Sequence, residues 1–345
     1  MRNFITSNEN AQFYECGYNC DNAWFAKLEG NSFFITDGRY TTEAREFIRS
    51  GTEIIESHDI TASLISLLNS QKIRELYFDP TQLSFSTYQE LSAKTQVKLI
   101  GEKKFHQKIR ICKTPQEIAK LERSQILNQQ AYQKVARFLQ ERGEGGTEKS
   151  LHYQIEGFLR DEGNYELSFL PIFGINQNAA KPHALPSKTS LKQKDLILLD
   201  AGIKFERYCS DCTRSAQFDK EMHFGKDQHF ADPFRQKIYD IVRRAQEKTI
   251  EQIREGMTGR EIDKIGREII SQEGYGKYFT HGTGHGIGLD IHELPIISAR
   301  SEEKVSEGMV FSIEPGIYLP GDFGVRIEDL VVIKNGRAEV LAQIL

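Results

Sequence analysis

The segment FTHGTGHGIGLDIHE, residues 279–293, is the most informative part of this sequence. It places His281, His285 and His292 among glycines at positions 282, 284, 286 and 288. Glycine costs close to ~1 kcal/mol per position in a helix interior, so we expect a loop or a glycine-broken strand here. Four positions without side chains let such a backbone approach a ligand or a metal ion closely.

Other interpretations of this segment are limited. A glycine-rich turn with surface histidines is the plain alternative. An HExxH zinc motif is excluded because Ile296 stands where the second histidine would be, and the chain contains no GxxxxGK[ST] phosphate loop. If the three histidines belong to a site, carboxylates from elsewhere in the chain are expected to complete it.

Two aspartates flank a predicted hairpin. Asp200 ends the apolar strand 196–199, and a turn near residues 205–206 returns the chain as a strand that carries Asp211. An antiparallel hairpin centred there would make the two aspartates cross-strand neighbours on one face. Two bare carboxylates at about 5 Å repel each other, so a cation must compensate.

Two glutamates repeat this arrangement. Glu314 and Glu328 are symmetric about a turn centred near Gly321, and each adjoins an apolar run. Salt bridges to Arg214 and Arg326 are the alternative explanation for the four acids. Four carboxylates with His285 instead favour two divalent ions, for which Mn, Fe, Co and Zn all suit the ligand types. Two such ions can polarise a carbonyl and activate water for hydrolysis.

Composition sets the class of protein. The 345 residues allow two domains, and 45 Lys plus Arg against 49 Asp plus Glu leave a net charge of -4, which gives no basic footprint for nucleic acid. With no apolar signal segment or membrane span, we expect a soluble, cytoplasmic protein. The five cysteines are then expected to be reduced, with a redox pair at Cys209 and Cys212 as an alternative.

The secondary-structure pattern changes near residues 105–113. Residues 1–110 alternate strand-like and helix-like pieces, which predicts a small α/β domain. Residues 111–345 begin with long helices, and N-terminal capping patterns at Thr114, Thr147, Asp232 and Thr258 predict where they start. The predicted organisation is therefore two domains, 1–110 and 111–345.

Taken together, the motifs resemble the pita-bread metallopeptidases, the family of methionine aminopeptidase, Xaa-Pro aminopeptidase and prolidase. The resemblance covers the chain from about residue 112 onward and lies in Asp200-Ala-Gly, Ser-Asp211-x-Thr-Arg, Gly-His285-Gly-Ile-Gly, Ile-Glu314-Pro-Gly and Arg326-Ile-Glu328-Asp. The DGRY sequence at 37–40, which alone reads as a polar turn, resembles the smaller domain of the creatinase and prolidase branch. The implied fold is α+β, a pita-bread catalytic domain after a creatinase-type α/β domain.

The resemblance implies roles for individual residues. The implied metal ligands are Asp200, Asp211, His285, Glu314 and Glu328. They would bind two divalent ions, for which Mn is the first choice, and the region of Asp200 and Glu328 would bridge the two ions. Glu314 would also be the general base, as suits a carboxylate beside the nucleophile. The implied substrate contacts are His183, His281, His292, Tyr318 and Arg326. Of these, His292 would contact the scissile carbonyl and His183 would orient the substrate. The alternatives are that His183 is a surface histidine, that Tyr318 only packs against its neighbours, and that Arg326 is a structural counter-ion.

Within the family, the folded first 110 residues disfavour methionine aminopeptidase, while PHA at 182–184 and HE at 292–293 resemble the proline-specific branch. We therefore expect a Xaa-Pro aminopeptidase that uses a bridging hydroxide between two metal ions, with prolidase as the alternative. A metal-free binding protein on the same fold is a further alternative, against which five intact ligands argue. The family also implies peptide substrates and a homodimer.

Overall fold

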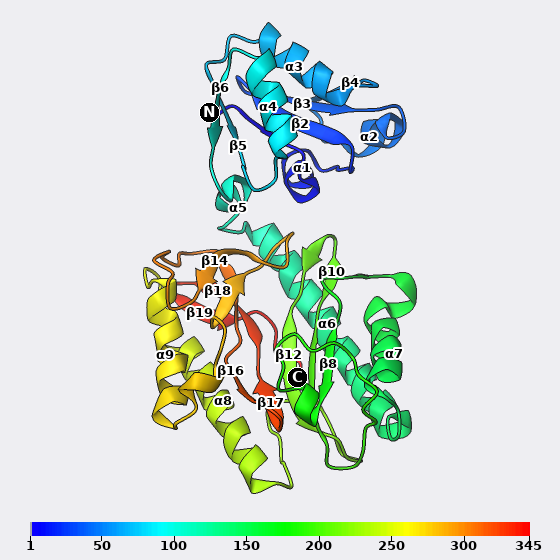
Figure 1. The fold of residues 1–345 in the computed structure, drawn as a ribbon, viewed down its shortest axis with the longest axis vertical. Coiled ribbons are helices and arrows are strands. Elements are labelled where there is room, and N and C mark those ends of the chain that lie inside the picture. Colours follow the sequence, from blue (N-terminus) through cyan, green and yellow to red (C-terminus); the bar gives the residue numbers. More distant parts are fainter. Residues whose placement is uncertain (1) are drawn as a thin grey trace. The chain divides into compact units, whose positions relative to one another are not determined.

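The computed structural model describes residues 2–345, so the first residue of the expected N-terminal domain lies outside the described part. The chain divides into two units, of which the first ends at Arg110 and the second begins at Ile111 (Figure 1). Among residues 2–345, every helix is too short or too polar to span a bilayer.

The first unit is a six-stranded sheet with helices. The strand order is β4-β3-β2-β1-β5-β6, antiparallel between β1, β2 and β3 and parallel elsewhere. Its elements are β1 (Phe4–Thr6), α1 (Glu9–Cys16), β2 (Ala23–Leu28), β3 (Asn31–Thr36), α2 (Thr41–Phe47), β4 (Thr52–Glu56), α3 (Ile60–Ser70), β5 (Glu75–Phe78), α4 (Phe85–Lys94), β6 (Lys98–Gly101) and α5 (Phe105–Ile109). The predicted alternation of strands and helices is confirmed from β3 onward. The DGRY segment forms a turn in which Arg39 NH2 lies 2.8 Å from Asp37 Oδ2.

The second unit has four long helices around several small sheets. Its elements are α6 (Pro115–Arg142), α7 (Glu148–Arg160), β7 (Glu166–Leu167), β8 (Ile172–Ile175), β9 (Leu196–Ala201), β10 (Ile203–Phe205), β11 (Tyr208–Cys209), β12 (Cys212–Gln217), α8 (Pro233–Gln252), α9 (Gly259–Gln272), β13 (Gly284–Gly286), β14 (Glu293–Ile297), β15 (Val310–Ile313), β16 (Gly316–Leu319), β17 (Phe323–Arg326), β18 (Asp329–Lys334) and β19 (Arg337–Val340), with short 3-10 turns η1 (Asp161–Gly163), η2 (Asn176–Asn178) and η3 (Gly276–Tyr278).

The helix starts follow the local capping chemistry. Thr114 and Thr258 each form a complete capping box with the glutamate three residues later, and Thr147 and Asp232 accept hydrogen bonds from the first turns of α7 and α8. Each cap satisfies backbone N–H groups that have no partner within the helix. All four predicted helix starts are confirmed.

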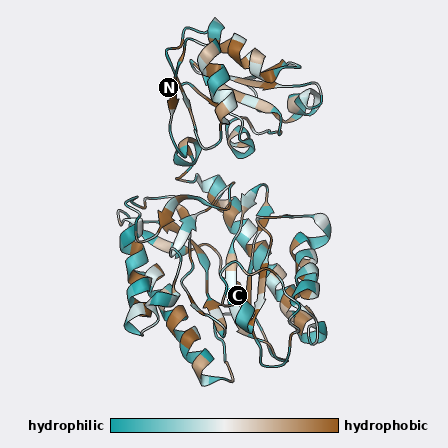
Figure 2. Cartoon of the chain, viewed as in Figure 1, coloured by the Kyte–Doolittle hydropathy of each residue, from teal (hydrophilic) through white to brown (hydrophobic). Residues whose placement is uncertain are grey.

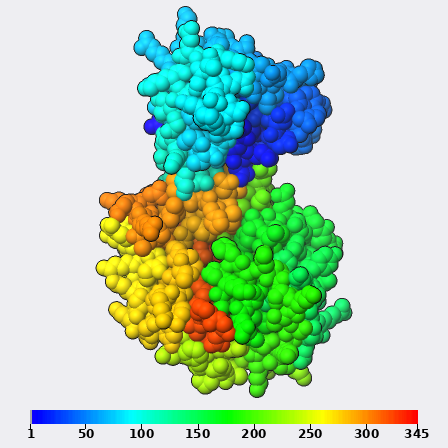
Figure 3. Space-filling model, viewed as in Figure 1, coloured from blue at the N-terminus to red at the C-terminus, as the bar shows by residue number. Residues whose placement is uncertain are grey.

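The helices lie on two sides of the strands. In Figure 1, α6 and α7 lie on the side of β8 and β12, and α8 and α9 lie on the opposite side. Figure 2 shows hydrophilic and hydrophobic residues along each of these helices, as expected of helices with one face against a sheet. In Figure 3 the red C-terminal segment lies between the yellow and green segments. The strands of the second unit therefore lie between the α6–α7 pair and the α8–α9 pair.

The hairpin register corrects one prediction and confirms another. Glu206 and Arg207 form the first turn with positive φ of 46° and 73°, so Asp200 pairs with Thr213 and not with Asp211. The turn lies one residue beyond the expected centre, which offsets Asp211 by two positions but keeps it on the same face. The ladder Ile313↔Asp329 and Gly316↔Arg326 brackets the two glutamates, which confirms their predicted symmetry about Gly321.

Candidate metal centre and active site

Five acidic and histidine side chains from separate strand ends line one pocket of about 580 Å³. They are Asp200 in β9, Asp211 before β12, His285 in β13, Glu314 after β15 and Glu328 before β18. These are the five residues expected to be metal ligands. The fold therefore brings together positions that span most of the second unit.

The side chains converge on a small volume. His285 Nε2 lies 3.6 Å from Asp211 Oδ2 and 3.4 Å from Glu314 Oε1. Donor atoms of Asp211, His285 and Glu328 all lie within 4.8 Å of one another. Such spacing lets one ion contact atoms from all three side chains after small adjustments.

The glycines on either side of His285 explain how its imidazole is aimed. A Cβ at Gly284 would lie 1.9 Å from the Ser312 carbonyl oxygen, and one at Gly286 would lie 2.0 Å from the Leu294 carbonyl oxygen. Only glycine therefore lets β13 pass between β14 and β15. The expectation of a glycine-broken strand is confirmed, with a register shift between His285 and Gly286.

Hydrogen bonds fix the tautomer of His285. Its Nδ1 lies 3.0 Å from the Gly286 carbonyl oxygen, which can only accept, so Nδ1 carries the proton. Its Nε2 lone pair then faces the carboxylates of Asp211 and Glu314. Burial lowers the pKa of His285, which favours the neutral ring. A neutral imidazole aimed in this way is a typical metal ligand.

The carboxylates of the pocket are buried close to one another, which disfavours their charged forms. Burial, and then the nearby carboxylates, raise the pKa of Asp211 and of Glu328 well above their usual range, and burial also raises the pKa of Glu314. Among the residues that the structure describes, Asp200 Oδ1, Asp211 Oδ1 and Glu328 Oε1 are buried without a hydrogen-bond donor. Buried carboxylate oxygens without donors are costly unless a cation binds them. The residues present therefore fit divalent metal ions.

Arg326 connects the candidate ligand Asp200 to Tyr318. Its guanidinium donates to Asp200 Oδ2 at 2.6 Å, to Thr213 Oγ1 at 2.9 Å and to Tyr318 Oη at 2.8 Å. Thr213 Oγ1 in turn donates to Glu328 Oε2 at 2.8 Å. The salt-bridge interpretation thus holds for Asp200, and the same contacts of Arg326 orient the side chains of candidate ligands.

The second candidate arginine has a different role. Arg214 is buried and pairs with Asp329 at 2.6 Å, so it does not form a salt bridge with any of the four pocket acids. Its NH1 does donate to the Glu328 carbonyl oxygen, which is a backbone contact. Arg214 therefore supports the strand that carries Glu328 without neutralising its carboxylate.

The remaining predicted residues lie around this cluster. His183, His281, His292 and Arg326 line the pocket. The rings of His285 and His292 are 4.3 Å apart, and burial, with His285 and His183 nearby, lowers the pKa of His292 to about 4. Tyr318 lies behind His281 and contacts its Nε2 at 2.7 Å, so it acts on the pocket through that ring.

Sequence reasoning missed several contributors. Thr213 and Ser312 contact the candidate ligands Glu328 and Glu314, and Lys113 forms a buried ion pair of 3.1 Å with Glu293, the residue after His292. Thr213 could have been found, because it lies two residues beyond Asp211 and thus on the same strand face. Burial raises the pKa of Cys209 and of Cys212 to about 12, which keeps both thiols protonated.

The fold and the pocket define a class of protein, a creatinase-type domain followed by a pita-bread metallopeptidase domain. The chain belongs to metallopeptidase family M24, whose model matches residues 119–335, and residues 2–112 match the creatinase/prolidase N-terminal domain. This confirms the predicted fold class and the prediction of a peptidase.

Individual relatives agree with this assignment. The uncharacterized peptidase YqhT of Bacillus subtilis is 34% identical over 340 residues, which cover 97% of this chain and 92% of that protein. A Xaa-Pro dipeptidase from Bacillus anthracis has a TM-score of 0.90 at 30% identity and covers 99% and 93% of the two chains. An X-Pro aminopeptidase from Thermotoga maritima has a TM-score of 0.87 at 30% identity and covers 100% and 96%.

Proposed function

We propose that this chain is a metal-dependent Xaa-Pro aminopeptidase, which removes the first residue from peptides with proline in second position. The observation that carries the proposal is the single pocket that holds all five candidate ligands beside His183, His281 and His292. Two divalent ions bound there would supply Lewis-acid activation of the scissile carbonyl and water activation near neutral pH. The Xaa-Pro dipeptidase and the X-Pro aminopeptidase among the similar structures both support action on a Xaa-Pro bond.

The chain's own residues would handle the protons. Glu314 is held by Ser312, whose Oγ donates to Glu314 Oε1 at 3.1 Å. Burial raises the pKa of Glu314, which suits a general base that must take a proton near neutral pH. His292 is a neutral ring at that pH because its pKa is about 4, so its N–H can donate to the scissile carbonyl.

The site also suits proline. A proline ring has no N–H and a fixed φ, so it needs shape and apolar contact and cannot be held through a backbone donor. Arg326 donates to Tyr318, and the Tyr318 hydroxyl contacts His281 Nε2, which sets the ring of His281 at the pocket wall. The pocket's apolar lining includes Phe169, Leu170, Pro171, Ile172, Ala184 and Leu185.

The charge of the pocket favours peptides longer than two residues. A dipeptide carries a free carboxylate on its proline, which needs a cation. Among the lining side chains that the structure describes, Arg326 is the single arginine or lysine, and Asp200, Thr213 and Tyr318 already occupy its guanidinium. Prolidase activity is the second candidate, because dipeptidases are among the similar structures.

Further features of the proposal come from the family resemblance. We propose Mn as the metal and a homodimer as the assembly. The oxygen-rich ligand set suits Mn. The five free cysteines suit a reducing compartment, in line with the proposed cytoplasmic location. Metal analysis of the protein as isolated and light scattering test the first two points.

A peptide panel tests the proposed function. Mn-loaded protein is incubated with Gly-Pro-Ala, Gly-Pro, Gly-Ala-Ala and Met-Ala-Ser, beside an EDTA-treated control. We expect glycine release from Gly-Pro-Ala alone, and loss of that release with EDTA. Cleavage of Gly-Pro alone would identify a dipeptidase, and cleavage of Met-Ala-Ser alone would replace the proline assignment with methionine removal.

A further inference from the structure

We propose that Glu148 is a positioning residue that holds the segment 175–187, and through it His183, at the pocket. The importance of His183 for turnover rests on the proposed function. The contacts of Glu148 with the segment do not depend on it. Glu148 is fully buried in the structure although it carries a carboxylate.

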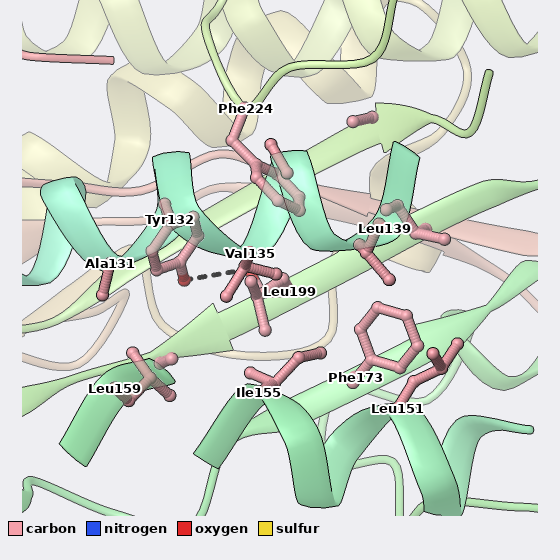
Figure 4. Close-up of a cluster of buried hydrophobic side chains, with 14 of the residues drawn as sticks. Ala131, Tyr132, Val135, Leu139, Leu151, Ile155, Leu159, Phe173, Leu199 and Phe224 are labelled. Atoms are coloured by element: carbon pink, nitrogen blue, oxygen red, sulfur yellow. Dashed lines mark hydrogen bonds between the residues drawn. The ribbon is translucent and has the colours of Figure 1, made fainter. Parts of the chain in front are cut away.

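Glu148 is anchored on a rigid part of the molecule. It is the first residue of α7, and the spacing 148, 151, 155 and 159 places it on the same helix face as Leu151, Ile155 and Leu159. Figure 4 shows these three side chains packed with Val135, Leu139 and Phe173, and all are at most 3% exposed. The carboxylate therefore sits at the end of a packed apolar stripe.

The carboxylate binds both ends of the segment. Its Oε1 accepts a hydrogen bond from the Ile175 N–H at 2.7 Å, and its Oε2 accepts from Asn178 Nδ2 and from the Ser187 N–H, each at 2.7 Å. Asn178 Nδ2 also donates to the Leu185 carbonyl oxygen at 2.9 Å. A single side chain thus closes this irregular excursion between β8 and β9.

The middle of the segment carries groups that face the pocket. Pro182, His183 and Leu185 line it, and the Pro182 carbonyl oxygen accepts from Arg326 NH1 at 3.3 Å. The segment is therefore held at its base by Glu148 and at its tip by Arg326. Fixing such a segment costs conformational entropy, which these hydrogen bonds offset.

The three donors explain why a carboxylate stands at position 148. An ionised carboxylate is an acceptor at both oxygens, and its bonds to N–H groups are stronger than bonds between neutral groups. The start of α7 also favours negative charge. Glutamine has nearly the same shape but only one acceptor oxygen. In either orientation its NH2 group faces at least one of the donors. Glu148→Gln therefore loses at least one of the three hydrogen bonds to the segment 175–187 without leaving a cavity.

The test compares Glu148→Gln with Thr147→Ala. Thr147 caps the same helix, because its Oγ1 accepts from the Ser150 N–H, and this side chain makes no bond to the segment 175–187. We expect Glu148→Gln to lower kcat/KM for Gly-Pro-Ala at least tenfold, with unchanged Mn affinity by calorimetry. Thr147→Ala should lower the melting temperature and keep kcat/KM within twofold. Equal kcat/KM for the two variants would overturn the proposal.

Two further readouts separate positioning from a general structural role. In a His183→Ala background, Glu148→Gln should lower kcat/KM by less than twofold, because both changes act on one loop. Hydrogen exchange of residues 175–187 should be faster in Glu148→Gln than in wild type. A fully multiplicative loss, or unchanged exchange, would contradict the proposal.

Control outcomes keep this test independent of the proposed function. If Glu148→Gln does not fold, Asn178→Ala removes one of the three donors and should give a smaller loss of kcat/KM together with faster exchange of the segment. If wild-type protein cleaves no Xaa-Pro peptide, the proposed function fails. The exchange measurement then still decides whether Glu148 holds the segment.

Discussion

Replacing Asp211 with asparagine should stabilise the metal-free protein and abolish its stabilisation by metal. Asp211 and Glu328 have ligand atoms within 4.8 Å of each other, and both carboxyls are buried. Two full charges at that distance repel by about 3 kcal/mol at an effective dielectric of ~20. The raised pKa values of both groups relieve part of this repulsion by protonation, so we expect a gain of about 2 kcal/mol.

The stability difference between Asp211→Asn and wild type should also depend on pH. Asp211, Glu314 and Glu328 have folded-state pKa values above their unfolded values of about 4. Their contribution to stability is therefore fully present below pH ~4 and is lost as the pH rises through the folded-state values. The advantage of the asparagine variant in EDTA should widen as the pH rises from 5 to 8.

Scanning calorimetry in EDTA and in Mn measures both effects. A gain of about 2 kcal/mol corresponds to a rise of about 4–8 °C in melting temperature for a unit of this size. Added Mn should raise the melting temperature of wild type and leave that of the variant unchanged. The exposed Asp240→Asn serves as the control and should change little. A metal-free Asp211→Asn protein that melts below wild type across this pH range would show that repulsion between the Asp211 and Glu328 carboxylates does not destabilise the metal-free protein.

Two other variants test separate parts of the account. Glu314→Gln should lower kcat for Gly-Pro-Ala by about 10²–10⁴-fold, the range for loss of a general base, with a native circular dichroism spectrum; near-wild-type turnover would remove Glu314 from that role. Lys113→Met should cost about 3–5 kcal/mol of unfolding free energy in urea titrations, because Lys113 and Glu293 are 1% and 0% exposed and the buried carboxylate would lose its cation. The double variant Lys113→Met/Glu293→Leu should recover most of this loss, apart from the hydrogen bond that Glu293 accepts from the Asp290 N–H; no recovery would show that the loss does not come from an uncompensated carboxylate.

Local chemistry made much of the fold predictable from the sequence. The capping boxes at Thr114 and Thr258 depend on residues three apart, so they could be recognised without tertiary information. The register of Glu314 and Glu328 was also predictable, because Gly321 marks the turn and adopts a positive φ of 80°. The strands and helices of the first unit were predictable from their alternating sequence patterns, which are also local.

The register of the aspartate hairpin was less accessible. Glu206 and Arg207 adopt left-handed φ values although neither is glycine, so the sequence carries no clear sign of the turn centre. A shift of one residue in that centre moves every cross-strand partner by two. The prediction that Asp200 faces Asp211 directly was wrong for this reason, while their shared strand face was retained.

Most long-range partners could not be predicted from sequence. The residue types of the five candidate ligands, their places at strand ends and Arg326 as a candidate counter-ion were visible, but the sequence did not show which of the four acids Arg326 contacts. The partners of Glu148 and Lys113 are likewise set by tertiary packing. A glutamate in a capping turn and a lysine before a helix look like ordinary surface residues in the sequence.

We propose that the carboxylate and histidine cluster is a two-metal hydrolytic centre. The most direct measurement is the rate of Gly-Pro-Ala hydrolysis as Mn is added to EDTA-dialysed protein, with bound metal counted by mass spectrometry in the same samples. We expect no hydrolysis without metal and a rate that saturates near two ions per chain. Hydrolysis that persists in fully metal-free protein would contradict it, as would metal binding that never produces cleavage.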